Sequence, residues 1–519
     1  MPNTSQIAPT VVSCYGGLTL NKDIFSMKPG EATQLTNFEP DIAGGYQKIL
    51  GTTAYNANIV TQVSASSEIV DMVAIFNDIV FAARGGTVWS AGTTGSWTSR
   101  ATSKGTTYRY DFERYNYNGT EKLMIATGTT NAFSIAADGS YTEDVINATG
   151  GGTAPTAPKF VSSFKNHMFY AGMSDAVSTV QFSGPYTEDD FNTGAGTILV
   201  DTTIVGLNVF REALFVFGED RIYKITGSSS SDFALVPVTR KIGCVDGKTI
   251  QELGGDLIYL APDGLRSIAG TERIGDIELG TVSKQIQERI SDIGTDNITS
   301  TVIRGKSQYR LFYPTTTGTE QLAKGLLGVL KTNPETGTLG FEYADIKGLK
   351  PSCCDSGFIS GDEKIIHGGY DGYVYKQEDG GSYTRAGSTY TITGFYRSPD
   401  MSLGDPGIRK TMQRVLVNYK VREAIDATSS FQTFSLKYNF DDTKTPQPSP
   451  YSFSSAQVAA FYGSGTYGTS AYGSTGFPME RVSVEGSGFV VAFKLEDTST
   501  KKALSLRGFE LEYVNGGRR

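Results

Sequence analysis

The sequence predicts an all-β fold: a β-propeller of about seven blades, a C-terminal β-sandwich domain and an extended N-terminal arm. A strand–turn–strand pattern returns at intervals of 43 to 46 residues, and this rhythm stops after Tyr383. The 519 residues include 61 glycines and 11% aromatic residues but only 19% charged ones, which is typical of short strands joined by tight turns. We therefore assign residues 1–51 to the arm, 52–386 to the propeller and 387–519 to the sandwich.

The arm is rich in polar residues and glycine and has no blade pattern of its own. Segments of this kind gain order by pairing with a partner, so we expect the arm to lie outside its own propeller and to tie subunits together. Its first residues, MPNTSQIAPTVVSCYGG, have neither a basic nor an apolar signal region. No apolar run approaches the ~18 residues of a membrane span, so we expect neither an export signal nor a spanning helix.

The repeat is clearest in NVFREALFVFGEDRIYKITG, residues 208–227, where two apolar runs flank the polar pair Glu219 and Asp220. Each copy has an apolar residue, two or three polar or small residues, and then an apolar strand. The tetrad Tyr-Thr-Glu-Asp occurs at Tyr141 and again 45 residues later at Tyr186, which agrees with this period. A parallel solenoid is the alternative, but its repeats are usually shorter and lack such hairpins. The clearest copies begin at Phe76, Phe164, Phe210 and Leu253.

One segment has a helical pattern instead. Apolar residues recur at Val282, Ile286, Ile290 and Ile293, the spacing of one helical face. We expect a helix over residues 281–293, with Thr281 or Ser283 as its cap. The helix either covers the propeller, which we favour, or binds a partner.

After Tyr383 at least five strand-like runs follow in about 130 residues, which fits a separate sandwich that folds by itself. This part also contains FYGSGTYGTSAYGSTGF, residues 461–477, with Tyr-Gly pairs five residues apart. That interval suits neither helix nor strand and predicts a loop. The loop either stacks its tyrosines on a partner, a sugar or a single-stranded nucleic acid, or is a plain surface or subunit-interface loop, which we favour.

The sequence predicts no catalytic, cofactor-binding or metal-binding residues. His167 and His367 are the only histidines, both lie in or beside predicted strands, and no G-x-S-x-G elbow accompanies them. Glu143-Asp144 and Glu188-Asp189-Asp190 could supply two carboxyls for glycoside cleavage, but equivalent turns of successive blades explain them better. Phosphate-binding and calcium-binding loop motifs are missing as well.

The four cysteines form no C-x-x-C pair and have no histidine nearby, which argues against a zinc site. We expect Cys14, Cys244, Cys353 and Cys354 to be small core residues in a reducing compartment. The formal net charge of −8 argues against a nucleic-acid binder, because such a protein needs a basic surface to replace phosphate counterions.

Several segments together resemble tailed-bacteriophage virion proteins, over most of the chain. They include the arm residues Gly16–Asn21, Lys28–Ala32 and Leu35–Pro40, the propeller residues Gly206–Phe210, Ile222–Gly227, Ile242–Val245 and Asp263–Leu265, and the later residues Tyr396–Asp400, Gly404–Lys410 and Val484–Gly488.

The resemblance is to the propeller-bearing tail hub or nozzle proteins that extend the neck of short-tailed phages. It implies a homo-oligomeric ring, usually sixfold, that is assembled in the host cytoplasm and lies in the virion below the portal and adaptor. Tail fibre proteins would be further partners, and phage DNA would pass through the ring during ejection. A receptor- or glycan-binding tail or baseplate module and a polysaccharide-cleaving tail enzyme remain the alternatives.

Overall fold

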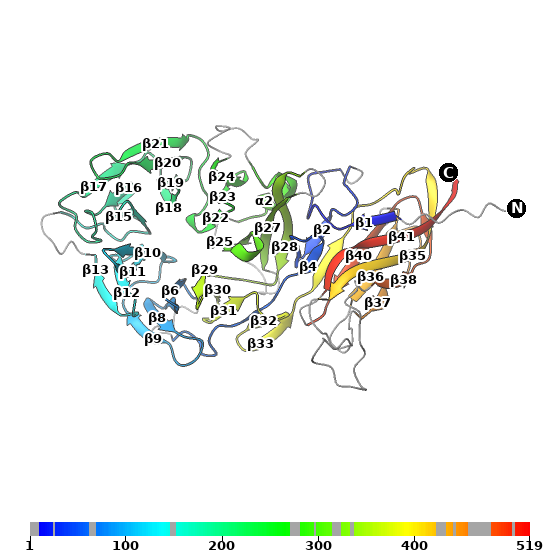
Figure 1. Ribbon diagram of the computed structural model, residues 1–519, viewed down its shortest axis with the longest axis horizontal. Helices are drawn as coiled ribbons and strands as arrows, with labels where there is room; N and C mark the ends of the chain where they lie inside the picture. Colours follow the sequence, from blue (N-terminus) through cyan, green and yellow to red (C-terminus); the bar gives the residue numbers. More distant parts are fainter. Residues whose placement is uncertain are drawn as a thin grey trace.

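The computed structural model describes residues 10–23, 26–61, 69–145, 152–269, 281–294, 297–313, 323–332, 337–421, 432–439, 443–454, 479–500 and 504–518. The protein is an all-β propeller, as the sequence predicts, and its blades form the ring at the left of Figure 1. Within the described ranges, no helix has the length and hydropathy that crossing a bilayer requires.

Four blades are separate sheets of four antiparallel strands, each formed by one continuous stretch of chain. They are β6 (Met72–Phe76), β7 (Ile79–Arg84), β8 (Thr87–Ala91) and β9 (Thr98–Ala101); β10 (Asp111–Tyr117), β11 (Thr120–Ala126), β12 (Phe133–Ala136) and β13 (Tyr141–Asp144); β14 (Phe160–Phe164), β15 (His167–Met173), β16 (Ala176–Phe182) and β17 (Gly196–Leu199); and β18 (Ile204–Phe210), β19 (Ala213–Gly218), β20 (Ile222–Thr226) and β21 (Ala234–Thr239).

The next sheet has three strands, β22 (Gln251–Leu253), β23 (Asp256–Ala261) and β24 (Gly264–Ser267), and the 3-10 turn η1 (Gly247–Thr249) precedes it. Strands of two larger sheets complete the ring. The ring therefore has slightly fewer blades that consist of their own strands alone than the seven that the sequence predicts. The completing strands are β25 (Thr299–Ile303), β26 (Gln308–Tyr313), β27 (Lys324–Thr332) and β28 (Leu339–Lys347), and then β29 (Cys353–Ile359), β30 (Asp362–Gly368), β31 (Val374–Gln377) and β5 (Thr52–Ala54).

The repeated sequence pattern is the hairpin between the first two strands of a blade. In the β6–β7 hairpin Phe76 pairs with Ile79, so that only Asn77 and Asp78 form the turn, and both have positive φ (47° and 62°). Lys165 and Asn166 form the same turn between β14 and β15. A two-residue turn with two positive φ angles matches the twist of a hairpin. In these two copies the polar pair therefore meets a backbone requirement.

The predicted helix is present but short. It consists of η3 (Lys284–Ile286) and α2 (Gln287–Ser291), and Ile286 and Ile290 are buried in the largest hydrophobic core. Ser283 precedes η3 without a capping hydrogen bond from its side chain; its hydroxyl accepts instead from the Leu265 amide, 2.9 Å away. The apolar face thus packs inward, as expected of a helix that covers the propeller.

Beside the ring lie two further groups of strands, at the right of Figure 1. One is a seven-stranded sheet that contains β3 (Phe38–Pro40), β4 (Tyr46–Lys48), β41 (Leu504–Arg518), β35 (Ile408–Val421) and β38 (Met479–Ser483), with β1 (Thr10–Ser13) paired to β41 and β39 (Ser487–Gly488) paired to β35. The other continues the β25–β28 blade through β2 (Gln34–Thr36), β34 (Gly394–Arg397), β40 (Val491–Asp497), β36 (Gln432–Tyr438) and β37 (Tyr451–Phe453).

The two groups face each other through aromatic side chains. The Phe509 ring of β41 lies 4.1 Å from the Phe493 ring of β40 and 5.9 Å from the rings of Tyr396 and Phe434, measured between centroids. The same core continues to Tyr343 of the β28 blade strand. Propeller and C-terminal sheets therefore share one hydrophobic core as well as one nine-stranded sheet.

The arm is part of these C-terminal sheets. β2 lies between β28 and β34, and β4 and β1 both pair with β41, so residues 10–48 join strands from the far end of the same chain. β5 begins at Thr52, where the sequence predicts the propeller to begin, and pairs with β31. It also pairs with β32 (Ser382–Arg385), and β33 (Ser388–Thr391) extends that sheet across the predicted boundary at residue 387.

A buried set of charges fixes the arm to the propeller; we call Glu39, Lys306, Arg310 and Glu378 the junction cluster. Glu39 lies on β3 with no exposed surface, and its carboxylate pairs with Lys306 Nζ at 2.5 Å and with Arg310 Nη2 at 3.3 Å. Both cations also pair with Glu378. Two positive and two negative groups thus neutralise one another, with Glu39 and Arg310 fully buried and Lys306 and Glu378 partly exposed.

Candidate functional site

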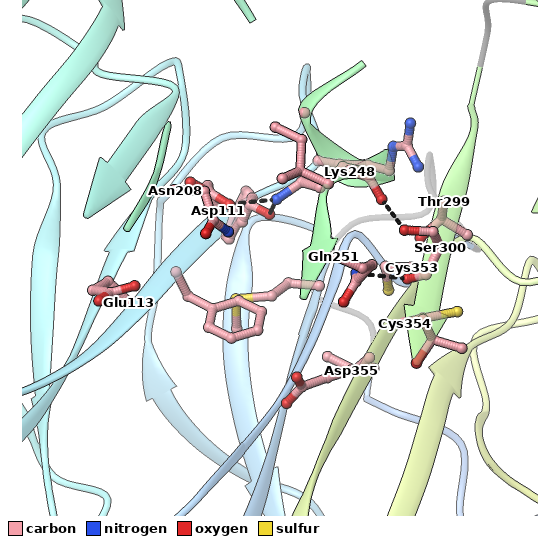
Figure 2. Close-up of a pocket in the computed structure, with 18 of the residues that line it drawn as sticks. Asp111, Glu113, Asn208, Lys248, Gln251, Thr299, Ser300, Cys353, Cys354 and Asp355 are labelled. Atoms are coloured by element: carbon pink, nitrogen blue, oxygen red, sulfur yellow. Dashed lines mark hydrogen bonds and ion pairs between the residues drawn. The ribbon is translucent and has the colours of Figure 1, made fainter. Parts of the chain in front are cut away.

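The inner strands of the ring enclose a polar cavity of about 330 Å³. Every inner strand, β6, β10, β14, β18, β22, β25 and β29, contributes to its wall, so the cavity lies on the propeller axis. Figure 2 shows Asp111, Asn208, Gln251 and Asp355 converging on it from different strands, and Lys248 from the η1 turn. We call this space the axial cavity.

Ion pairs neutralise the charges of this wall. Lys248 Nζ lies 2.7 Å from Asp111 Oδ1 and also donates to the Tyr110 carbonyl at 2.9 Å. Arg114 pairs with Asp355, whose Oδ2 accepts from the Ile75 amide at 2.7 Å. These two pairs cross from one inner strand or turn to another and thereby fix the spacing of the blades around the axis.

The two other cations of the wall are paired as well. Arg109 Nη2 lies 3.4 Å from Asp246 Oδ2, and Arg304 Nη1 lies 3.5 Å from Glu363 Oε1. Glu113 is the one charged residue of the wall, among the described residues, for which the structure shows no ion pair. Burial raises the pKa of Glu113 to about 8, although a backbone hydrogen bond from Ser163 opposes the shift. Glu113 is therefore mainly protonated at neutral pH, and the four cations of the wall are balanced by Asp111 and Asp355 within it and by two carboxylates beside it, those of Asp246 and Glu363.

The axial cavity adjoins a further hollow at each end. Where the inner strands end, it shares Arg114, Arg304 and Ser356 with one of them. The other lies where the inner strands begin. Arg109 and Lys248 line both the cavity and a second hollow of about 400 Å³ whose rim includes Tyr108 and Tyr370. Asp71 lies in the same wall, and burial raises its pKa to about 7, although Arg109 partly offsets this. The rim therefore combines two tyrosine rings with hydrogen-bonding groups.

The two histidines lie in strands and are buried, as their sequence positions suggest. His167 Nδ1 lies 2.6 Å from the Ser183 carbonyl oxygen, and its ring meets Phe182 and Phe233 edge-on. His367 stacks on the Tyr375 ring, and burial lowers its pKa to about 3. Neither histidine lines the axial cavity. Packing explains both.

The structure does not bring the two predicted carboxylate groups together. Asp144 lies on β13 and pairs with Lys104, whereas Glu188 follows β16 of the next blade and pairs with Lys122. Asp189 and Asp190 accept hydrogen bonds from their own turn, from Thr187 and Asn192. The Glu143 side chain lies outside what the structure describes. These are blade-edge and turn residues.

Cys14 and Cys244 are buried core residues, and burial raises the pKa of the Cys244 thiol to about 12. Cys353 and Cys354 are half-buried neighbours on β29 and contribute to the axial cavity. In the described ranges all four are free thiols, and no cluster of histidine, cysteine and carboxylate side chains could hold a metal ion. The Tyr-Gly loop at residues 461–477 lies outside the described residues.

The residues of the axial cavity were not predicted from the sequence. The pattern that could have indicated them is Asp111-Phe112-Glu113-Arg114, where three charged residues lie in a strand that begins a blade. Charged residues on an inner strand are costly unless they face a polar cavity or one another. The carboxylates of the outer turns were more conspicuous only because they repeat.

Known protein families and curated proteins give no match to this sequence. Solved structures that resemble it include the WD40 β-propeller domain of Doa1, with 13% identity and a TM-score of 0.33 over 64% of this chain and 96% of that one. An ancestral GH74 enzyme has 11% identity and a TM-score of 0.37 over 70% and 51%. Hsv2 of Kluyveromyces lactis has 9% and 0.33 over 54% and 85%.

Proposed function

We propose that this chain is a structural component of a bacteriophage virion, a tail hub or nozzle ring protein below the portal and adaptor that forms part of the DNA-ejection conduit. The sequence resemblance suggests this role. The observation that carries it furthest is the junction of the two parts of the chain: a nine-stranded sheet runs from blade strand β25 to β37, and one core underlies both parts.

Such a junction suits a ring subunit, because forces between neighbouring subunits must pass through each chain without bending it. A hinge between two domains usually has a small, polar interface. Here the connection consists of backbone hydrogen bonds and buried aromatic rings, and the junction cluster adds paired charges. The net charge of −8 also fits a wall that does not retain passing DNA.

The test is the mass of the purified chain in solution, alone and with a portal–adaptor complex, together with gold labelling of the chain in intact particles. We expect a closed ring, formed alone or on the complex, and label at the neck or tail. A chain that stays monomeric in both samples and is absent from purified particles would contradict the proposal.

A depolymerisation assay on host surface polysaccharide separates this proposal from the enzymatic alternative. We expect no cleavage. Cleavage that is lost when Glu113 is replaced by glutamine would favour a tail enzyme whose acid group lies in the axial cavity.

A further inference from the structure

The axial cavity has no part in a purely structural role, yet it has the size and chemistry of a binding site. Its volume of about 330 Å³ lies at the lower end of the range of about 300–1,000 Å³ for small-molecule sites. The wall is chiefly polar, and its donors and acceptors come from several inner strands. An apolar ligand would leave these groups without hydrogen-bond partners, which is unfavourable.

The charges of the cavity exclude ligands with a net charge as well. Lys248, Arg114, Arg109 and Arg304 each have an acidic partner. An anion would have to displace a carboxylate that already holds its cation, and a cation would have to displace an amine or guanidinium. Glu113 adds no charge at neutral pH, because burial raises its pKa to about 8. What remains is a neutral site with many hydrogen-bonding groups.

The polar groups that line the cavity include both donors and acceptors. The Asn208 and Gln251 amides offer both, and the carboxylates of Asp111 and Asp355 retain acceptor positions beside their ion pairs. Where the inner strands begin, the Tyr108 side chain is 42% exposed. Lys159 Nζ lies over its ring, 4.2 Å from the centroid, so the rest of the ring surface is left for the C–H face of a ligand ring. An uncharged molecule with several hydroxyl groups and one less polar face matches this arrangement.

We propose that the axial cavity binds a neutral saccharide unit, with Asn208, Gln251 and the Asp111–Lys248 pair as its hydrogen-bonding partners and with Tyr108 at the entrance. This site is independent of the proposed place in the virion. Such a site would allow a propeller with an otherwise structural role to bind a surface glycan.

The experiment is saturation-transfer NMR and calorimetric titration of the full chain with glucose, galactose, mannose and N-acetylglucosamine, and with glucuronic acid and glucosamine as charged counterparts. We expect binding of at least one neutral sugar, in the millimolar range or tighter, and weaker binding of the charged sugars. Absence of binding by every neutral sugar, or a preference for a charged one, would overturn the proposal.

Two variants locate the site. Asn208→Leu places an apolar side chain in the cavity, and Asn208→Ala removes only the amide; we expect affinity to fall by about tenfold or more in the first, which corresponds to ~1.4 kcal/mol, and less in the second. The matched control is Asn192→Leu, an exposed residue that does not line the cavity. Unchanged affinity in both Asn208 variants, or an equal loss in Asn192→Leu, would overturn the assignment of the sugar to this cavity.

Discussion

The blades and the C-terminal sheets differ in how far apart in the sequence their paired strands lie. The β14–β17 blade uses residues 160–199 alone, and each strand pairs with the next one along the chain. In the C-terminal sheets, β4 at residues 46–48 pairs with β41 at residues 504–518, more than 450 positions away. The blades therefore depend on local turns, whereas the C-terminal sheets depend on the two ends of the chain meeting.

The two regions also hold buried charge differently. The axial cavity surrounds its ion pairs with solvent-accessible polar groups, so that each pair is partly exposed: Lys248 and Asp111 retain 26% and 23% of their side-chain surface. In the junction cluster Arg310 and Glu39 retain 2% and 0%. Removal of one charged partner should therefore lower the free energy of unfolding much more at the junction cluster than at the axial cavity, because water cannot replace that partner at the junction.

The largest expected effect follows from removal of residues 1–48. β1, β2, β3 and β4 would be lost, and with them the fully buried Leu35, Phe38 and Tyr46. We expect β35 and β41 to lose protection in hydrogen-exchange mass spectrometry, while β14–β21 keep it, because those blades contain no arm residue.

The control for this deletion is Val11→Thr, a change at an exposed position of β1. It should leave the exchange of both regions unchanged. Full protection of β41 in the deletion variant would mean that the C-terminal sheets fold without the arm, as the sequence alone suggested.

Replacement of Arg310 by methionine comes next. The variant leaves Glu39 with Lys306 as its one remaining cation and removes a cation from Glu378. Breaking a buried pair on one side costs about 3–5 kcal/mol, and we expect a loss of that order in the free energy of urea unfolding. Arg221→Ala is the matched control, because its pairs with Asp201 and Asp220 are exposed and should contribute less than about 1 kcal/mol. Equal losses of unfolding free energy in the two variants would contradict the claim that the buried pairs of the junction cluster contribute more than exposed pairs.

Acid should weaken the junction cluster. Burial alone would raise the pKa of Glu378, but Arg310 and Lys306 outweigh it and hold this pKa at about 2. An unfolded glutamate has a pKa of ~4.3, so the cluster's contribution is complete above that value and is lost as the pH falls from ~4.5 toward 2. Urea midpoints across this range should fall less steeply for Glu378→Gln than for the native chain; parallel slopes would contradict the assignment.

The last effect has the opposite sign and belongs to the axial cavity. The pKa of Glu113 is raised to about 8, chiefly by burial, so its contribution is complete below the unfolded value of ~4.3 and is lost as the pH rises toward 8. Glu113→Gln should flatten the urea midpoint between about pH 5 and 8 without changing the acid slope. A variant that retains the native slope over this interval would show that Glu113 is ionised throughout.

The sequence determined the blades because their information is local. Asn77-Asp78 and Lys165-Asn166 each fill a two-residue turn, and such turns, repeated at a regular spacing, predict a propeller without knowledge of any distant contact. The position of the helix within residues 281–293 could be predicted for the same reason, because the residues of its apolar face recur every few positions.

Only the tertiary structure decided the parts that depend on distant segments. The sequence predicts an arm that ties subunits together, whereas Leu35 and Tyr46 pair with Tyr396 and Leu506 of the same chain. Nothing near Leu35 or Tyr46 in the sequence indicates these partners. The axial cavity likewise consists of one to four residues from each inner strand, so its charges appear scattered along the chain until the ring closes. The conformation of a turn depends on residues that are neighbours in the sequence. A strand pairing or a cavity between distant residues forms only when folding brings them together against the entropy of closing the loop between them.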